Sequence, residues 1–353
     1  MQRAIGALRA VAGRSAASAA AMRLSPSAAL WRSQSTGATT APPPAKPDTV
    51  SVIAAPFSFG QPLDGVERGA AEMKAAGLRG KIAALGYRVH EHPAIEVHRP
   101  TVHDPVSPIG GRNAYAVGVT AARIAEATAA AAAAGHFVLT LGGDHSLAMG
   151  SLGGILRARP EVGVVWVDAH ADINAPETSP SGNVHGMPLS FLMKLVDAAR
   201  VPGCEWVAEL PRLAASSLVY VGLRDLDVAE KRFIKTLGLR AYTMHDLDRY
   251  GVGKVMEMGL DYLAGTKPRA LHLSYDIDAI DPTVAPSTGT SVPGGLNYRE
   301  AHYVAEACAE SGLLGSMDVV EINPDLVPGA GGMATVAMGV ELVQSALGKS
   351  ILE

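Results

Sequence analysis

The chain has 353 residues, of which 48% are hydrophobic and 18% charged, and its formal net charge is −4. This composition is typical of a globular protein with a substantial core, and so small a net charge offers no basic surface for nucleic acid or for a membrane. No apolar run is long enough for a membrane-spanning helix, and two cysteines, Cys204 and Cys308, cannot form a disulfide framework. We therefore expect neither nucleic acid nor a membrane as a partner.

The N-terminal segment differs in composition from the rest. Five arginines lie among alanines and serines, and no acidic residue precedes Asp48. A positively charged, acid-free segment of this kind is typical of a mitochondrial transit peptide, with a plastid peptide or a plain extension as alternatives. Thr39–Pro47 is rich in proline and would form a stiff linker. We expect a transit peptide and linker over residues 1–47, a location in the mitochondrial matrix, and one folded domain over residues 48–353.

From Val50 onward, short apolar runs alternate with longer helical patterns. In chain order, strands are predicted at Val50–Ala55, Tyr87–Val89, Phe137–Leu141, Gly163–Val167, Leu218–Val221, Arg240–Thr243, Ala270–Tyr275 and Ser316–Val320. Between them, helices are predicted at Val66–Leu85 (broken near Gly77 and Gly80), Ala114–Ala134, Leu147–Arg157, Glu230–Leu237, Gly253–Leu263, Tyr298–Ser311 and Thr335–Ala346. This alternation indicates an α/β fold: a single doubly wound domain with a mostly parallel sheet flanked by helices on both faces.

Acidic residues and histidines follow four of the predicted strands. Ligands of α/β sheets bind outside the carboxyl ends of the strands, so these side chains are expected to meet at one edge. The segments are Gly142–Ser146 (GGDHS), Asp168–Asn174 (DAHADIN), Asp276–Pro282 (DIDAIDP) and Glu321–Pro324 (EINP).

These segments predict a site for two metal ions. Alternate residues of an extended DxHxD segment point the same way, and a DxD segment and a further histidine add to the set. Carboxylates this close repel one another unless cations neutralise them, and two divalent ions would balance four of them. Oxygen ligands with imidazole favour Mn²⁺ over structural zinc, and two ions about 3.5–4 Å apart can activate a shared water. The candidate ligands are His145, Asp168, His170, Asp172, Asp276 and Asp278.

Each motif alone would more often be a solvated loop or a turn. Asp144 and Asp281 neighbour glycine or proline and are expected to stabilise turns. His272 lies inside a predicted strand and is expected in the core, and Asp318 is expected to point away from the site. We expect no second metal site in the proline-containing connector that carries His90, His92, His98 and His103.

Together, the motifs resemble those of the arginase family of the ureohydrolases, and the likeness runs from Ala55 almost to the C-terminus. The residues that carry it are Gly142–Ser146, Asp168–Asn174, Ser181–Pro188 (SGNVHGMP), Gly222–Asp227 (GLRDLD), Tyr275–Pro282, Gly289–Leu296 (GTSVPGGL) and Val320–Asn323. The resemblance implies two Mn²⁺ ions per subunit. One would be held by His145, Asp168, Asp172 and Asp276, and the other by Asp168, His170, Asp276 and Asp278.

The resemblance also implies roles for other residues. His185 would carry a proton to or from the substrate, and Glu321 would pair with a guanidinium group. Asn174, Ser181 and Asn183 would bind an α-carboxylate, Asp227 an α-amino group, and Thr290 would lie near the reacting centre. The adjacent pair Arg299-Glu300 would contribute to a homotrimer.

The implied reaction is hydrolysis of L-arginine to L-ornithine and urea by a hydroxide that bridges the two ions. Another ureohydrolase, such as an agmatinase, would share the metals and differ in the far end of its substrate. An amine-only substrate would leave the carboxylate-binding groups unpaired, which favours arginine. A protein that keeps the fold but only binds its ligand is the alternative of another class.

Overall fold

The computed structural model describes residues 47–107, 109–265 and 269–352. The predicted transit peptide lies outside the described residues. One sheet of eight strands runs in the order β2-β1-β3-β8-β7-β4-β5-β6, and every neighbouring pair is parallel. The strands are β1 (Thr49–Ala54), β2 (Arg88–Glu91), β3 (Phe137–Leu141), β4 (Gly163–Val167), β5 (Leu218–Leu223), β6 (Arg240–Thr243), β7 (Leu271–Asp276) and β8 (Leu314–Val320).

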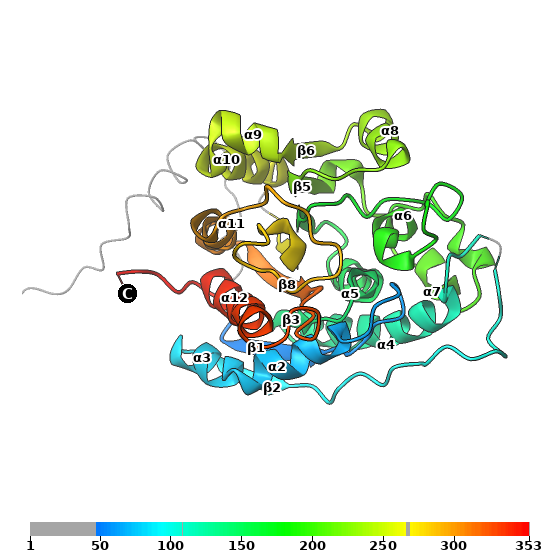
Figure 1. Cartoon of the computed structure of the whole chain (residues 1–353), viewed down its shortest axis with the longest axis horizontal. Coiled ribbons are helices and arrows are strands. Elements are labelled where there is room, and N and C mark those ends of the chain that lie inside the picture. The colour runs from blue at the N-terminus through cyan, green and yellow to red at the C-terminus, as the bar shows by residue number, and fades with distance from the viewer. Residues whose placement is uncertain (1–46, 108, 266–268, 353) are drawn as a thin grey trace, which may run out of the picture. The chain divides into compact units, whose positions relative to one another are not determined.

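Helices cover both faces of this sheet (Figure 1). On one face the core includes side chains from α2 (Gly69–Ala75), α3 (Leu78–Ala84), α9 (Met244–Tyr250), α10 (Val252–Ala264), α11 (Tyr298–Glu310) and α12 (Ala330–Ala346). On the other face it includes side chains from α4 (Ala114–Ala133), α5 (Ala148–Ala158), α6 (Pro188–Leu192), α7 (Glu205–Ala208) and α8 (Val228–Leu237). The predicted doubly wound α/β fold is confirmed.

Strand β4 is apolar throughout because both of its faces are covered. Val165 and Val167 belong to the first of these two core clusters, whereas Val164 and Trp166 belong to the second. Successive side chains of a strand point to opposite faces, so a strand covered on both sides has no solvent-exposed position, and a polar residue there needs a buried partner, as His272 of β7 has in Ser316 and Asp318 of β8.

All eight strands lie where the sequence predicts them, but several helices differ. The first predicted helix does break at Gly77, whose positive φ of 84° favours glycine, but the predicted break near Gly80 is wrong because that residue lies inside α3. Helices α6, α7 and α9 were not predicted, and α12 begins at Ala330, five residues before the predicted start at Thr335. Glycine is a poor helix former, so Gly332 made the sequence before Thr335 look non-helical. In the structure this glycine is needed inside the helix, because a Cβ there would lie 2.3 Å from the carbonyl oxygen of Pro324.

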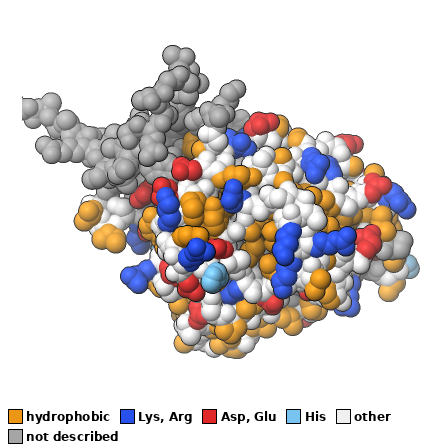
Figure 2. All heavy atoms as spheres, turned by 90° about the horizontal axis from the view of Figure 1, so that it is seen from above, with side chains coloured by type: hydrophobic (Ala, Val, Ile, Leu, Met, Phe, Trp, Pro, Cys, Tyr) orange, Lys and Arg blue, Asp and Glu red, His pale blue; other side chains and the backbone are white. Residues whose placement is uncertain are grey.

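The face drawn in Figure 2 carries basic and acidic side chains interspersed with hydrophobic ones. Within the described ranges, no helix is both long and apolar enough to cross a membrane.

Candidate metal centre and active site

The carboxyl ends of five adjacent strands, β3, β8, β7, β4 and β5, bring the predicted site residues together. Each strand is followed by a short loop or a single turn of 3-10 helix that presents polar side chains above the sheet edge. After β3 comes His145, after β8 Glu321, at the end of β7 Asp276 and then Asp278, after β4 Asp168 to Asp172, and after β5 Asp227.

His145 lies at the centre of the first ligand group. Its Nδ1 lies 3.1 Å from Asp168 Oδ2, 3.0 Å from Asp172 Oδ2 and 3.1 Å from Asp276 Oδ2. The side chain is fully buried, and its Nε2 lies 2.9 Å from the hydroxyl oxygen of Ser274. One ring nitrogen is therefore held by a hydroxyl while the other faces three carboxylates.

The geometry at this nitrogen fits a metal ligand better than a hydrogen-bond donor. Although three carboxylate oxygens surround Nδ1 of His145, none of the described residues makes a well-directed hydrogen bond with it. A buried ring nitrogen without a hydrogen bond is costly, whereas a shared cation would satisfy the nitrogen and the oxygens at once. The donors present thus fit a divalent ion at this point.

A second ligand group lies beside the first and shares Asp168 with it. His170 Nδ1 lies 3.3 Å from Asp168 Oδ1 and 3.1 Å from Asp278 Oδ2. One ligand atom from each of His145, Asp168 and Asp276, and likewise from each of Asp168, His170 and Asp278, can lie within 4.8 Å of the others. Two adjacent groups with a common carboxylate are the arrangement expected for a pair of metal ions.

Electrostatics point the same way. Burial, with the charges of Asp278 and Asp168, raises the pKa of Asp276 well above its usual range. Burial, with the charge of Asp168, raises the pKa of Asp172 to about 6. These carboxylates therefore attract positive charge strongly, and protons and metal ions compete for the same oxygens.

Trp166 supports both ligand groups from below. Its ring stacks on that of His145, with centroids 4.2 Å apart and planes 10° apart. Its indole N–H donates to Asp168 Oδ2 at 3.0 Å. Nothing in the spacing of the sequence motifs pointed to this residue, which lies inside a strand.

A pocket opens next to the ligand groups, and the residues predicted to bind substrate line it. They come from the loop after β4, from the segment around 3-10 helix η3 (Val184–Gly186), from the start of α8 and from the loop that carries Thr290. The lining residues include Asn174, Ser181, Asn183, His185, Asp227 and Thr290, together with the candidate ligands His170, Asp172 and Asp276.

Two further lining residues, Ser179 and Glu230, were missed. Glu230 is buried, and burial raises its pKa to about 7. Its carboxylate accepts the backbone N–H of Asp227 at 3.0 Å as part of the capping box that starts α8. The D-x-x-E spacing was visible in the sequence, but it predicts a helix start and says nothing of a pocket.

Glu321 lies behind this pocket, not in its wall. The side chain is 2% exposed, its Oε1 accepts the backbone N–H of His145 at 2.8 Å, and the same oxygen lies 3.2 Å from Nδ1 of His185. Burial alone would lower the pKa of His185, but Glu321, with Asp172 and Asp144, raises it to about 9. Glu321, which was predicted to pair with the substrate, thus contacts His185 in this structure.

Two of these acids have unusual backbone conformations. Asp172 and Glu321 have positive φ values of 49° and 61°, in the left-handed region that favours glycine. Such conformations in non-glycine residues cost about 1–3 kcal/mol each and gather at functional sites.

The other acids and histidines considered from sequence have structural contacts. Asp144 accepts the backbone N–H groups of Gly60 and Ser146, at 2.9 and 3.0 Å. Asp281 accepts those of Thr283, Gly294 and Gly295 in a turn. His272 is buried and contacts Ser316 and Asp318 of β8, so Asp318 pairs with His272 inside the sheet and not with the residues of the site.

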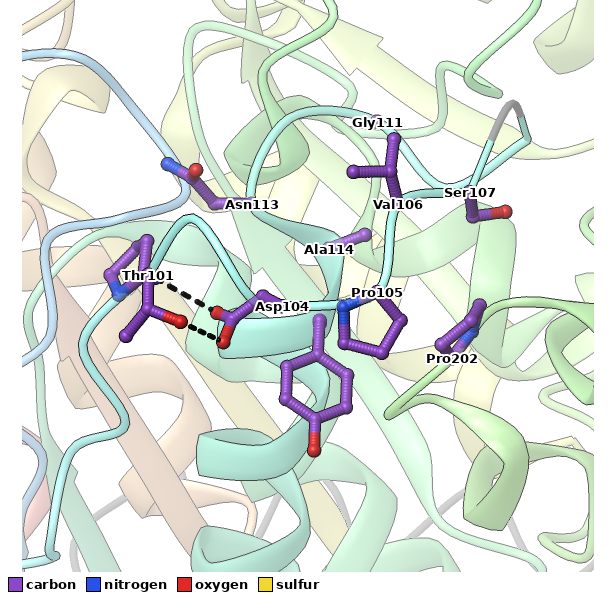
Figure 3. A pocket seen from close by; sticks show the side chains of 11 residues that line it. Thr101, Asp104, Pro105, Val106, Ser107, Gly111, Asn113, Ala114 and Pro202 are labelled. Atoms are coloured by element: carbon purple, nitrogen blue, oxygen red, sulfur yellow. Dashed lines mark hydrogen bonds between the residues drawn. The ribbon is translucent and has the colours of Figure 1, made fainter.

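Among the four connector histidines, His98 contacts an acid: its Nε2 lies 3.1 Å from Asp104 Oδ2. Figure 3 shows a hollow lined by a later part of the same connector, where Asp104 accepts the backbone N–H and the hydroxyl of Thr101, at 3.2 and 2.7 Å. The carboxylate of this hollow is therefore already engaged in holding its own loop.

Comparisons with known proteins agree with this geometry. A model of the "Arginase family" matches residues 48–348. The chain is 46% identical over 278 residues to the hepatic arginase of Aquarana catesbeiana, which covers 78% of this chain and 85% of the relative. It is 42% identical over 305 residues to "Arginase-2, mitochondrial" of Homo sapiens, which covers 86% of this chain and 85% of the relative.

A solved structure is similar over nearly all of the described chain. The arginase from Bacillus caldovelox superposes with a TM-score of 0.80 at 36% identity and covers 87% of this chain and 99% of its own. The motifs at the strand ends, the paired ligand groups and these matches lead to one conclusion: the chain belongs to the arginase family.

Proposed function

We propose that this chain hydrolyses L-arginine to L-ornithine and urea with two manganese ions. The observation that carries the proposal is the pair of ligand groups that share Asp168 and adjoin a pocket lined by polar residues. Relatives named arginase at more than 40% identity support the same reaction.

His145, Asp168, Asp172 and Asp276 would hold one ion, and Asp168, His170, Asp276 and Asp278 the other. When bound, the two ions would activate a water molecule near neutral pH for attack on the guanidinium carbon. Six ligands rich in oxygen, with two imidazoles, favour Mn²⁺ among the divalent ions available.

The far end of arginine would be held by groups that can pair with both of its charges. Asn174, Ser181 and Asn183 offer hydrogen bonds to the α-carboxylate, and Asp227 offers a negative charge to the α-amino group. Asn174 already donates to Asp227 Oδ2 at 2.8 Å, so the two subsites are adjacent. A substrate without the carboxylate would leave donors unpaired in a partly buried pocket, which is unfavourable.

His185 would supply the proton that the leaving amine needs. Its Nδ1 faces Glu321, which leaves Nε2 as the nitrogen that exchanges a proton with the substrate. Glu321 would orient the ring through Oε1, and its Oε2 would pair with the guanidinium once the substrate has entered deeper than the present pocket wall. A histidine that a neighbouring carboxylate keeps protonated at neutral pH can donate a proton to the leaving amine, as this role requires.

A urea assay tests the proposal directly. The purified chain, loaded with Mn²⁺, is expected to release urea from arginine, and a sample treated with a chelator is expected to release none. Agmatine lacks the α-carboxylate of arginine. A site that hydrogen-bonds such a group rejects an analogue without it by about 10⁴-fold or more, so kcat/KM for agmatine should be lower than that for arginine by this factor. Comparable turnover of agmatine would identify an agmatinase. If neither compound released urea, the chain would be a protein that binds its ligand without hydrolysing it.

We also propose that the full chain is imported into mitochondria and assembles as a homotrimer. The arginine-rich, acid-free N-terminus supports the first point, as does the human relative whose name includes "mitochondrial". The exposed side chain of Arg299 at the start of α11 is available for a neighbouring subunit. Fractionation of cells that express the full chain or residues 48–353 tests the import, and sedimentation equilibrium tests the trimer.

A further inference from the structure

One arginine in the GLRDLD motif connects three loops of the site. Arg224 follows β5, and its guanidinium makes five hydrogen bonds to four backbone carbonyl oxygens. Nη2 donates to Asp278 at 2.6 Å and to Val292 at 2.7 Å, and Nη1 donates to Ala279 at 3.1 Å. Its backbone N–H donates to the carbonyl of Ala169, between the ligands Asp168 and His170, at 2.9 Å.

The order of the strands makes this reach significant. Strand β4 lies between β5 and β7 in the sheet, so the side chain of Arg224 crosses the end of β4 to reach the loop after β7. Neighbouring strands lie about 4.8 Å apart, and only a long side chain spans two such intervals. Arg224 is therefore long enough to join loops that the sheet itself keeps apart.

The partners of Arg224 indicate what it is for. The guanidinium is half-buried, and every acceptor of its five hydrogen bonds is a carbonyl oxygen, not a carboxylate. Withdrawing a charge from water is costly, and neutral acceptors offset that cost less than an ion pair does. A planar fork of donors, however, can fix several backbone groups at once, which an ammonium group cannot.

The loops joined in this way carry a candidate ligand and a lining residue of the pocket. Asp278 Oδ2 accepts the hydroxyl of Thr290 at 2.8 Å and lies 3.1 Å from His170 Nδ1. Val292, which Arg224 holds, lies two residues after Thr290. At Gly295 a Cβ would lie 2.7 Å from Arg224 Nη2 and 2.6 Å from the backbone nitrogen of Asp281, so this close approach requires glycine.

We propose that Arg224 is a positioning residue that clamps the loop of Thr290 to the loop of Asp278 and thereby fixes the second ligand group. This inference rests on the proposed function, since it concerns the same metal pair. Loss of the clamp should let residues 289–296 move and should misplace the Asp278 carboxylate. Residues that orient metal ligands typically change metal affinity by about 10- to 100-fold when they are replaced.

The test compares Arg224→Met with the wild type in two measurements that do not depend on turnover. Competition with a chelator gives the Mn²⁺ dissociation constants, and hydrogen exchange followed by mass spectrometry reports on residues 289–296. We expect binding of one of the two ions to weaken by about 10- to 100-fold. We also expect the backbone amides of residues 289–296 to exchange faster. Arg224→Lys keeps the charge but not the fork, so it should show the same defects and serves if the methionine variant does not fold.

Arg269→Met is the matched control. Arg269 is also half-buried and donates to Ser217 Oγ at 2.9 Å, but it lies just before β7, at the opposite end of the strand from Asp276. Its replacement should leave Mn²⁺ affinity unchanged. Wild-type affinity and exchange in both Arg224 variants, or an equal loss of affinity in Arg269→Met, would overturn the clamp. A wild-type protein that binds no Mn²⁺ or releases no urea would instead overturn the proposed function.

Discussion

Replacing Trp166 with phenylalanine tests whether the side chain beneath the ligand groups sets their affinity for metal. Trp166 is fully buried, stacks on His145 and donates its N–H to Asp168 Oδ2 at 3.0 Å. Phenylalanine can keep an aromatic surface under the histidine but cannot donate. The substitution therefore removes one hydrogen bond from the carboxylate that the two ligand groups share.

The size of the effect can be worked out from that contact. A hydrogen bond to a charged group contributes about 1.5–3 kcal/mol, and a buried acceptor left without its donor loses that much. The same contact orients the carboxylate that both ligand groups share, and replacing a residue that orients a metal ligand typically weakens metal binding by about 10- to 100-fold, so the Mn²⁺ dissociation constant should rise by that factor. The smaller ring also leaves a cavity, which should lower the free energy of unfolding by about 1–3 kcal/mol.

Titration of the metal-free protein with Mn²⁺ in a chelator buffer measures the first quantity, and denaturant unfolding the second. Trp206→Phe is the matched control, because Trp206 donates to a carbonyl, that of Gly118, at 3.0 Å and contacts no candidate ligand that we identify. It should lose stability without losing metal affinity. Unchanged Mn²⁺ affinity in Trp166→Phe would refute the reasoning.

The site and its surroundings support three further predictions. Asp276→Ala should lose bound manganese, and elemental analysis that finds full occupancy would contradict its assignment. His185→Ala should keep both ions yet lose about 10²–10⁴-fold in kcat, the usual scale for an acid–base group, and a wild-type kcat would remove that role. Asp281→Asn should destabilise the metal-free protein by about 1 kcal/mol at pH 7, after allowance for solvent screening. Hydrogen bonds from Thr283, Gly294 and Gly295 lower the pKa of Asp281 from 3.8 to about 2. Its stabilisation is therefore complete above about pH 4 and is lost as the pH falls towards 2, so the difference between the two proteins in denaturant unfolding should shrink over that range, and a constant difference would argue against it.

Periodicity predicted the central strands well because they are buried on both faces. Phe137–Leu141 and Gly163–Val167 have the predicted bounds, since the apolar run ends where Gly142 and Asp168 follow. The edge strand Arg240–Thr243 also has its predicted bounds, although it is only partly buried. Helix α9 escaped notice although Thr243 and Asp246 form a capping box, because its seven residues are too short for a clear apolar period.

The candidate site was predictable as far as it depends on the residues directly after each strand. Contacts between distant segments were not. Gly60, for example, donates to Asp144 and accepts the backbone N–H of His185 at 3.0 Å, so a loop near the N-terminus holds a histidine 125 positions later in the sequence. Local pattern carries no record of such a contact. For the same reason the position of Glu321 behind His185, and the contacts of Trp166 and Arg224, required the folded chain.

The left-handed backbone at Asp172 opposes the stability of the metal-free protein to its activity. Glycine at this position would relax the main chain and remove a buried carboxylate that Asp168 repels, so it should raise the melting temperature of the metal-free protein, yet it would delete a candidate metal ligand. Glycine at Glu321 would relax the main chain too, but it would leave the buried N–H of His145 without its acceptor, which offsets the gain. A laboratory selection that rewards the thermal tolerance of the metal-free protein alone should therefore replace Asp172 and yield a more stable but inactive protein. Selection for urea release at high temperature would have to keep both acids and find its gains elsewhere.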